Sequence, residues 1–207
     1  MEGGAITGNK ITSSSGYGGG VYVDSNGTFT MTGGSINGNT ATSNTSSTVA
    51  GGVYVYISGT FAITGGSING NTITGSNTAI TGVYVSSSSA IFKVSGSPQI
   101  TDTVGLYAYS SSILSFAAIT LNGAFTPATA VPVDLLCYDA TAYNSGSPTV
   151  WDYKAVLKWD SAYTAHSATF PVDKFTLGKW LERNASNSAS ITGKKIDSTS
   201  GQLVNND

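Results

Sequence analysis

Charged residues are scarce in this sequence: nine basic and eleven acidic side chains are spread over 207 residues, with a net charge of −2. Without a basic excess the chain has no electrostatic attraction for nucleic acid, which is therefore not expected as a partner. Cysteine occurs once, as Cys137, so an intrachain disulfide and a cysteine-based metal site are both excluded. No apolar run reaches the roughly 18 residues that a membrane-spanning helix needs, so membrane insertion is not expected either.

Glycine occurs 26 times and Ser, Thr and Asn are abundant, a composition that often accompanies disorder, but the apolar and aromatic content of this chain argues for folding. Disordered chains combine high net charge with few aromatic and β-branched residues. Here apolar residues make up 40% of the chain, and tyrosine alone occurs 11 times. A chain of this composition can fold if its apolar residues recur at fixed positions.

An internal repeat of about 32 residues supplies that regularity. The heptapeptide GGSINGN occurs at 33–39 and again at 65–71, after a diverged copy, GGAITGN, at 3–9. A second motif, Gly followed by an apolar residue, Tyr and a further apolar residue, occurs four times: at 20–23, 52–55, 82–85 and, more weakly, 105–108. A third, with Phe and a further apolar residue before Gly, occurs at 28–33, 60–65 and 91–96.

Within the repeats, apolar residues alternate with other residues as they do in half-buried strands; Val21 and Val23, for example, flank Tyr22. One repeat cannot bury its apolar side alone, but stacked coils can, because each strand pairs with its counterpart one coil away. The stacking predicts three interior columns: Phe29/Phe61/Phe92, Met31/Ile63/Val94 and Ile6/Ile36/Ile68/Ile100. It also predicts a ladder of corner asparagines: Asn9, Asn39 and Asn71.

The expected fold is all-β: a right-handed parallel β-helix of the pectin-lyase-like kind, with about four regular coils in residues 1–125. Two inserts rich in Ser, Thr and Asn, Thr40–Ala50 and Thr72–Thr81, are predicted as loops on one side of the coils. Residues 126–207 hold 15 of the 20 charged residues. They are predicted to form irregular terminal coils and a C-terminal cap, packed on the end of the helix to cover its open strand edges.

The second part of the chain carries weaker strand patterns. Alternation predicts a strand at 131–137 and an amphipathic strand at 151–160. The segment 175–183 is compatible with either a short helix or a strand.

The pattern GGVYV…GTFxxTGGSIxGN, which covers roughly residues 3–123, resembles the repeats of large bacterial surface and secreted β-helix proteins. It is also similar to polymorphic outer-membrane protein repeats, whose GGA[ILV] hallmark is matched by residues 3–6. Their second hallmark, FxxN, is not matched, because Thr32 and Thr64 stand where Asn would be. The resemblance implies secretion or surface display, often with adhesion, and no catalytic residues.

Aromatic residues are the candidates for a ligand surface. The tyrosines of the second motif are expected to point outward as an exposed ladder on one face: Tyr22, Tyr54, Tyr84 and Tyr107. Pairing between neighbouring aromatic rings explains such a ladder without a ligand, although a carbohydrate or a protein could also use it. Three tryptophans of the second part could stack on sugar rings, or fill the core of the cap instead: Trp151, Trp159 and Trp180.

No catalytic, cofactor or metal site is expected. The first 125 residues contain only five charged residues, and in the aligned coils none lies beside another acid: Glu2, Lys10, Asp24, Lys93 and Asp102. The only histidine, His166, has no metal-spaced partner and is expected on the surface, and the calcium-binding GGxGxD repeat is absent. Thr28, Thr30 and Thr32 suggest an ice-binding face, but the next coils replace the middle threonine by Ala62 and Lys93.

The expected function is therefore a non-catalytic scaffold or adhesin. We expect it to be monomeric, extracellular or at the cell surface, part of a larger protein, and in contact with a host or bacterial surface protein or a polysaccharide. Two alternatives remain open at this point. One is a carbohydrate-binding or polysaccharide-cleaving β-helix module, and the other is an ice-binding protein.

Overall fold

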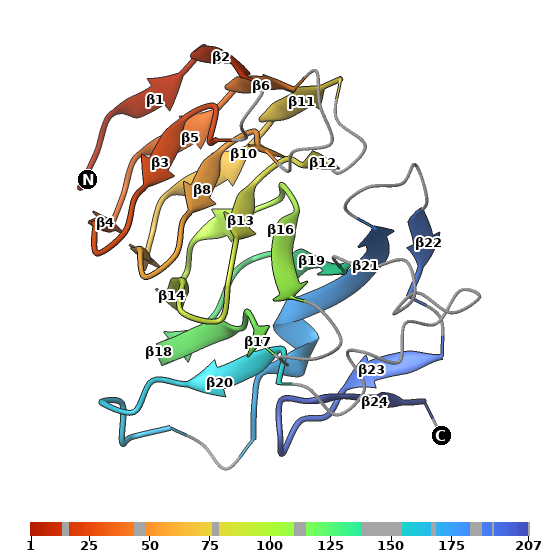
Figure 1. Ribbon diagram of the computed structural model, residues 1–207. Coiled ribbons are helices and arrows are strands. Elements are labelled where there is room, and N and C mark those ends of the chain that lie inside the picture. The colour runs from red at the N-terminus through yellow and green to blue at the C-terminus, as the bar shows by residue number, and fades with distance from the viewer. Residues whose placement is uncertain are drawn as a thin grey trace.

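The structure is a computed structural model, and its described part consists of residues 1–13, 17–43, 49–75, 79–109, 115–137, 155–166, 169–182, 188–191 and 193–206. In this part the chain forms strands and one 3₁₀ turn, η3 (Val172–Lys174), and no α-helix. Successive coils lie side by side from the N-terminal to the C-terminal end of the molecule (Figure 1). The all-β right-handed parallel β-helix predicted from the repeat is confirmed.

Three parallel sheets run along the coils. The first contains one strand from each regular coil: β1 (Ala5–Thr7), β5 (Ser35–Asn37), β10 (Ser67–Asn69) and β15 (Gln99–Ile100). The second contains β4 (Thr28–Met31), β9 (Thr60–Ile63), β14 (Ile91–Gly96), β18 (Ile119–Phe125) and β20 (Leu157–Trp159). The third contains β3 (Val21–Val23), β8 (Val53–Val55), β13 (Val83–Val85), β16 (Val104–Tyr109), β19 (Val131–Cys137) and β21 (Phe175–Glu182), with β22 (Ser188–Ser190) and β17 (Ser115–Phe116) added antiparallel.

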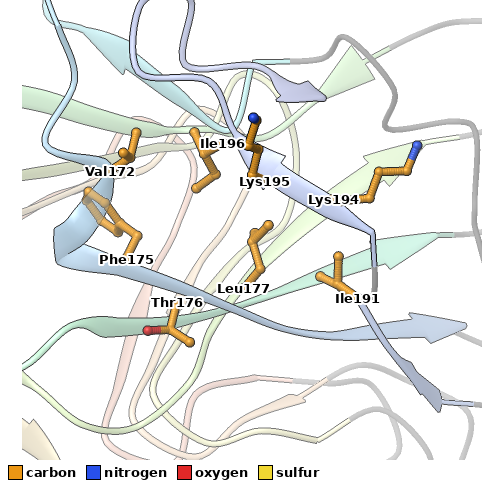
Figure 2. A pocket seen from close by; sticks show the side chains of 8 residues that line it. All are labelled: Val172, Phe175, Thr176, Leu177, Ile191, Lys194, Lys195 and Ile196. Carbon is orange, nitrogen blue, oxygen red and sulfur yellow. The ribbon is translucent and has the colours of Figure 1, made fainter. Parts of the chain in front are cut away.

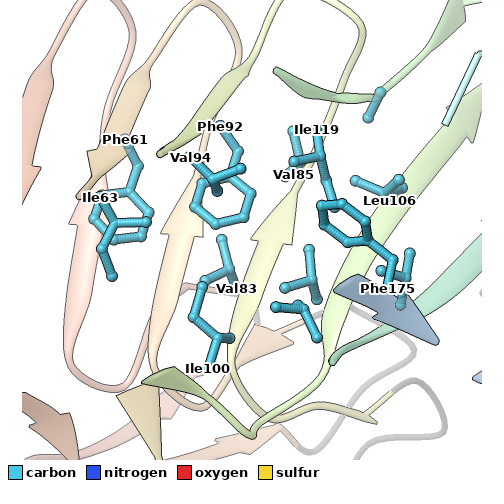
Figure 3. Packing of buried hydrophobic residues seen from close by; sticks show 14 of the residues in the cluster. Phe61, Ile63, Val83, Val85, Phe92, Val94, Ile100, Leu106, Ile119 and Phe175 are labelled. Atoms are coloured by element: carbon cyan, nitrogen blue, oxygen red, sulfur yellow. The ribbon is translucent and has the colours of Figure 1, made fainter. Parts of the chain in front are cut away.

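The predicted interior columns are present. Phe29 pairs with Phe61 and Phe61 with Phe92, and the ring centroids stack 5.5 Å and 5.3 Å apart. The columns that begin at Met31 and Ile6 are also in register. Figure 3 shows Phe61, Ile63, Phe92 and Val94 projecting to the same side of their strands. The even spacing of apolar residues therefore places one side of each strand in a continuous core.

Close stacking of the coils requires glycine at the corner before the first sheet. Gly66 has a φ of 85°, and a Cβ there would lie 2.6 Å from the carbonyl oxygen of Gly34 in the preceding coil. Gly34 has the same relation to Gly4. A side chain at either position would clash and would also strain the backbone.

The corner asparagines form the predicted ladder. The Nδ2 group of Asn39 donates to Oδ1 of Asn71, and Nδ2 of Asn9 donates to Oδ1 of Asn39, each over 2.9 Å. Asn39 and Asn71 also donate to the carbonyl oxygens of Ile6 and Ile36, respectively. A carboxylate that the sequence did not place there continues the ladder, because Asp102 accepts hydrogen bonds from the backbone N–H and Nδ2 of Asn71 at 2.9 and 2.7 Å.

The prediction that the two inserts are loops is wrong for most of their described residues. They pair in two further parallel sheets, one of β2 (Lys10–Ser13), β6 (Thr40–Ser43) and β11 (Thr72–Thr74), and one of β7 (Val49–Ala50) and β12 (Ala79–Ile80). Their β-branched residues favour strands, and the paired residues of successive coils lie 30 or 32 positions apart, which brings equivalent segments into register. Residues 44–48 and 76–78 lie outside the described part.

Parallel pairing continues after residue 125. The strand predicted at 131–137 is β19. The segment 175–183, for which the sequence left a helix or a strand open, forms the strand β21 over its first eight residues. At the end of the chain an antiparallel hairpin, β23 (Lys194–Ile196) and β24 (Leu203–Asn205), packs Ile196 and Leu203 into the main core. The division of the chain at residue 125 stays a prediction.

Candidate functional site

The second-motif tyrosines lie on the outer face of the third sheet. Tyr22, Tyr54 and Tyr84 are in register across β3, β8 and β13. Their ring centroids lie 5.6 Å apart for Tyr22 and Tyr54 and 5.0 Å apart for Tyr54 and Tyr84. The valines on either side of each ring face the core, so alternation correctly predicts the direction of these three side chains.

The expectation of an exposed ladder is wrong for its second half, because Tyr84 is only 3% exposed and Tyr107 5%. These two rings belong to a second apolar cluster outside the sheet, with partners from four other strands: Ala50, Ile80, Leu136 and Leu181. The insert strands β7 and β12 supply the first two of these residues, and the long strands β19 and β21 supply the others. Burial of apolar side chains from these neighbours closes this part of the face.

Tyr107 is also displaced from the ladder. Tyr84 pairs with Gly105, and Tyr107 pairs two residues further along with Leu136. A Cβ at position 105 would lie 2.5 Å from the Ile80 side chain, so glycine is needed where the ladder would have continued. Residues 105–108 resemble the earlier motif in sequence, but they are out of register with it in the sheet.

Four tyrosines at the first two coils form a more open group, which we call the tyrosine patch: Tyr17, Tyr22, Tyr54 and Tyr56. Tyr17 is 38% exposed, and the other three are partly exposed. Ring centroids within the patch lie between 4.8 Å, for Tyr17 and Tyr22, and 6.4 Å, for Tyr54 and Tyr56. Sequence reasoning missed Tyr17 and Tyr56, although Tyr56 directly follows the second motif in its coil.

A carboxylate borders the patch. Asp24 occupies the position equivalent to Tyr56 one coil earlier, because Tyr22 pairs with Tyr54. Burial and the neighbouring Asp24 carboxylate, which also forms a hydrogen bond with the phenol, raise the pKa of Tyr22 to about 12. Asp24 is the only charged residue between Lys10 and Lys93 in the sequence, so this charge is isolated along the chain.

The tryptophans do not join the patch. Trp159 lies at the end of β20, where its ring stacks against His166 and Phe170, each with centroids 4.9 Å apart, and it packs against the main core. This packing agrees with the interpretation of Trp159 as a core residue of the terminal region. Trp180 lies in β21 opposite Leu135, and Trp151 lies outside the described residues. His166 is exposed, as expected.

A regular threonine array lies on a different sheet from the one expected. Thr40 pairs with Thr72 and Thr42 with Thr74, and their hydroxyl oxygens lie 2.9 Å and 2.8 Å apart. On β2, Thr12 continues the row of Thr42 and Thr74. Lys10 takes the corresponding position in the row of Thr40 and Thr72 and ends that row. The array therefore comprises five threonines on three strands.

Charged side chains do not gather into a metal-binding group in the part of the chain that the structure describes. No group of three or more His, Cys, Asp or Glu side chains is close enough there to hold a metal ion. Lys93 forms an ion pair with Asp160, and the bound ammonium lowers the pKa of Asp160. In its own row Lys93 lies between Ala62 and Thr120, so its acidic partner comes from the residue that follows β20, two strands further along the sheet.

A cleft lies between β21 and the C-terminal hairpin. Its walls include Phe175, Leu177 and Ile196, and Lys194 and Lys195 stand at its border. Figure 2 shows the two lysine side chains extending in different directions, away from the apolar walls. The ammonium groups therefore do not converge on one anion-binding point.

Comparison with known proteins adds no assignment, since no protein-family model, curated protein or solved structure matches this chain. None of the described segments forms a helix of the length and hydrophobicity that crossing a membrane requires.

Proposed function

We propose that this chain is a non-catalytic adhesive scaffold that acts outside the cell or at its surface. The observation that carries the proposal is the tyrosine patch, a group of partly exposed rings held in register by a rigid stack of parallel strands. Rigid aromatic side chains provide contact area at a low cost in conformational entropy. A stacked sheet fixes their positions, so little further ordering is needed when a partner binds.

The distribution of charge supports binding rather than catalysis as the task of the regular coils. Asp24, the one acid near the patch, is in register with Tyr56 and Ser86 rather than with a second acid. General acid–base cleavage of a polysaccharide ordinarily requires two carboxylates on opposite sides of the scissile bond. A single carboxylate beside aromatic rings instead suits recognition, by accepting hydrogen bonds from a bound molecule.

The composition supports an extracellular location. Polar uncharged residues occupy outer positions of the coils, as in Thr28 and Thr30 of β4, and such a surface suits exposure outside the cell. We propose that the chain works as a monomer, and that its partners are polysaccharides or surface proteins of a host or of bacteria.

Adhesion without cleavage is directly testable. The purified chain is immobilised and exposed to a panel of plant, bacterial and host polysaccharides and to purified extracellular-matrix proteins. Saturable binding to a member of the panel, with no loss in length of the bound polymer, would support the proposal. Binding to nothing on the panel, or depolymerisation of a polysaccharide, would refute it.

The threonine array supports ice binding as a second candidate function. Regularly spaced hydroxyls on a flat sheet can order water in a lattice, and Thr40, Thr42, Thr72 and Thr74 form such rows. Measurement of thermal hysteresis tests this function: wild-type chain should depress the freezing point below the melting point, and Thr72→Lys should abolish the gap. No hysteresis in the wild-type chain removes this candidate.

A further inference from the structure

In the part of the chain that the structure describes, large apolar side chains reach solvent at or beside the tyrosine patch. Among the described residues, the large hydrophobic side chains with the highest exposure are Tyr17 at 38% and Ile57 at 45%. Tyr17 packs edge-on against Tyr22, and Ile57 follows Tyr56 in the chain. Both exposed side chains thus belong to, or adjoin, the same group of rings.

The spacing of the rings favours a ligand that lies on the outer surface of the patch over one that the rings would enclose. Tyr22 contacts the rings of Tyr17, Tyr54 and Tyr56 at centroid distances of 4.8 to 6.0 Å. Rings this close to one another fill the space between them, so no cage for an ammonium group remains inside the patch. The rings are tilted by 34° to 84° relative to one another, so the C–H face of a sugar ring can stack on the outer face of an individual tyrosine.

The negative charge of Asp24 favours neutral sugars over acidic ones. Asp24 places a carboxylate beside Tyr22, and no basic residue occurs in the sequence between Lys10 and Lys93. The carboxylate can accept hydrogen bonds from sugar hydroxyls and repels acidic sugars. Asp24 also accepts a hydrogen bond from the N–H of Ser25 over 2.7 Å, which holds the carboxylate in place at the turn after β3.

The amount of exposed apolar surface argues against a protein partner at this place. A stable protein interface buries roughly 800 Å² on each partner around an apolar centre. Among the described residues of this region, only Tyr17 and Ile57 are large apolar side chains with high exposure, and the second half of the tyrosine row is buried beneath other strands. A few sugar residues are enough to cover an exposed apolar surface of this size.

We infer that the tyrosine patch binds a neutral polysaccharide. Sugar rings stack on Tyr17 and Tyr56, and a sugar hydroxyl donates a hydrogen bond to the carboxylate of Asp24. This inference rests on the proposed adhesive function and names the class of ligand for it.

Binding of soluble β-glucan, mannan and galactan to the immobilised full chain tests the inference, with polygalacturonate as the acidic comparison. The variants are Tyr17→Ala and Tyr56→Ser; the second introduces the residue that the next coil carries at the equivalent position, Ser86, so the coil should still form. Tyr163→Ala, near Trp159 and away from the patch, is the matched control. Circular dichroism and the thermal midpoint confirm folding of each variant.

Wild-type chain should bind one of the neutral polymers and bind polygalacturonate at least about tenfold more weakly. Each patch variant should lose about tenfold in affinity, as expected for removal of an aromatic anchor, while the control binds like wild type. Neutral binding that survives both patch variants would overturn the site but leave adhesion standing. Binding only to polygalacturonate or to a matrix protein would overturn the ligand class, and binding to nothing would refute the proposed function as well.

Discussion

At the scale of single residues, the corner ladder shows how a buried polar row can be satisfied by repetition. The amides of Asn39 and Asn71 each donate to the next coil and to a carbonyl oxygen of the preceding coil, so both buried side chains have their hydrogen-bond partners. Asp102 ends the row because a carboxylate only accepts, and Asn71 supplies two donors to it. The row therefore specifies the register of the coils as well as stabilising it.

We predict that Asn39→Ala destabilises the chain by about 1–3 kcal/mol or more, because Asn9 and the carbonyl oxygen of Ile6 lose their partner. Asp102→Asn should cost less than about 1 kcal/mol, because the amide oxygen can still accept from Asn71. Urea unfolding of the two variants measures both values. Equal destabilisation would contradict this prediction and show that the charge of Asp102 contributes as much to the corner as the hydrogen bonds of Asn39 do.

A second carboxylate, Asp134, makes the stability of the fold depend on pH in the opposite sense to an ordinary ion-paired acid. Asp134 fits a β-bulge in which it faces Gly178 and Lys179, and its Oδ1 accepts the N–H of Lys179 over 2.7 Å. Burial raises the pKa of Asp134 above its ordinary value, against the smaller opposing effect of this hydrogen bond and of the Lys179 charge. The folded state therefore favours the neutral acid, and ionisation of Asp134 lowers stability as the pH rises above the unfolded-state pKa.

We accordingly predict that the stability of Asp134→Asn, relative to wild type, improves as the pH rises from below 3.8, the ordinary value, to neutral. The amide oxygen of Asn can still accept from Lys179, whereas Asp134→Ala removes the acceptor and should be destabilising at every pH. Chemical unfolding at a series of pH values gives the comparison. A difference between Asn and Asp that is independent of pH would contradict this explanation.

Tyr22 offers a test of the contact with Asp24. Because the pKa of Tyr22 is raised to about 12, its phenol should remain protonated in the folded chain at a pH where ordinary tyrosines ionise. Stability that depends on this phenol is present below the unfolded-state value near 10 and is lost as the pH rises toward 12. Ultraviolet titration should show late-ionising tyrosine absorbance that decreases by one tyrosine in Tyr22→Phe and shifts in part to lower pH in Asp24→Asn. An unshifted titration of Asp24→Asn would exclude the contact.

At the scale of elements, the stacked phenylalanines connect the strands of the second sheet. Phe61 is fully buried between Phe29 and Phe92, while Phe29 has a stacked ring on one side and is partly exposed. We predict that Phe61→Ala lowers stability by about 3–5 kcal/mol and Phe29→Ala by distinctly less. Unfolding midpoints in urea give the ranking, and an equal loss at both positions would contradict the assigned packing.

The sequence predicts elements best where neighbouring coils are copies of each other. Phe61 and Ile63 fall in columns because identical repeats pair in identical register. Asp102 could not be placed in this way, because it lies two residues after Ile100, whereas Asn71 lies three residues after Ile68. A repeat that is shortened by one residue changes the alignment from that point onward.

Burial of the outer tyrosines could not be predicted from alternation. Alternation tells which side of a strand a residue occupies, and Tyr84 does face away from the main core. It does not tell whether another element covers that side. The covering residues Ala50 and Ile80 come from two-residue strands in segments rich in Ser, Thr and Asn, where composition indicates loops.

At the scale of the whole molecule, the β-helix is a row of coils, each in contact with its neighbours along one axis (Figure 1). Such a scaffold holds surface groups at fixed spacing without enclosing a pocket between coils. The open aromatic patch lies at one end of the row, on β3 and β8, and the C-terminal hairpin covers the core at the other. The proposed binding surface is therefore separate from the C-terminal end of the row.

The central claim is that the chain binds a neutral polysaccharide and leaves it intact. Size-exclusion chromatography of the chain with the β-glucan, mannan or galactan that it binds, before and after prolonged incubation, tests both parts in one experiment. We predict that wild-type chain co-elutes with the polymer, that Tyr56→Ser elutes separately, and that the polymer peak keeps its position. A polymer peak that moves to smaller size in the presence of the wild-type chain would contradict the account and identify the protein as a polysaccharide-cleaving enzyme.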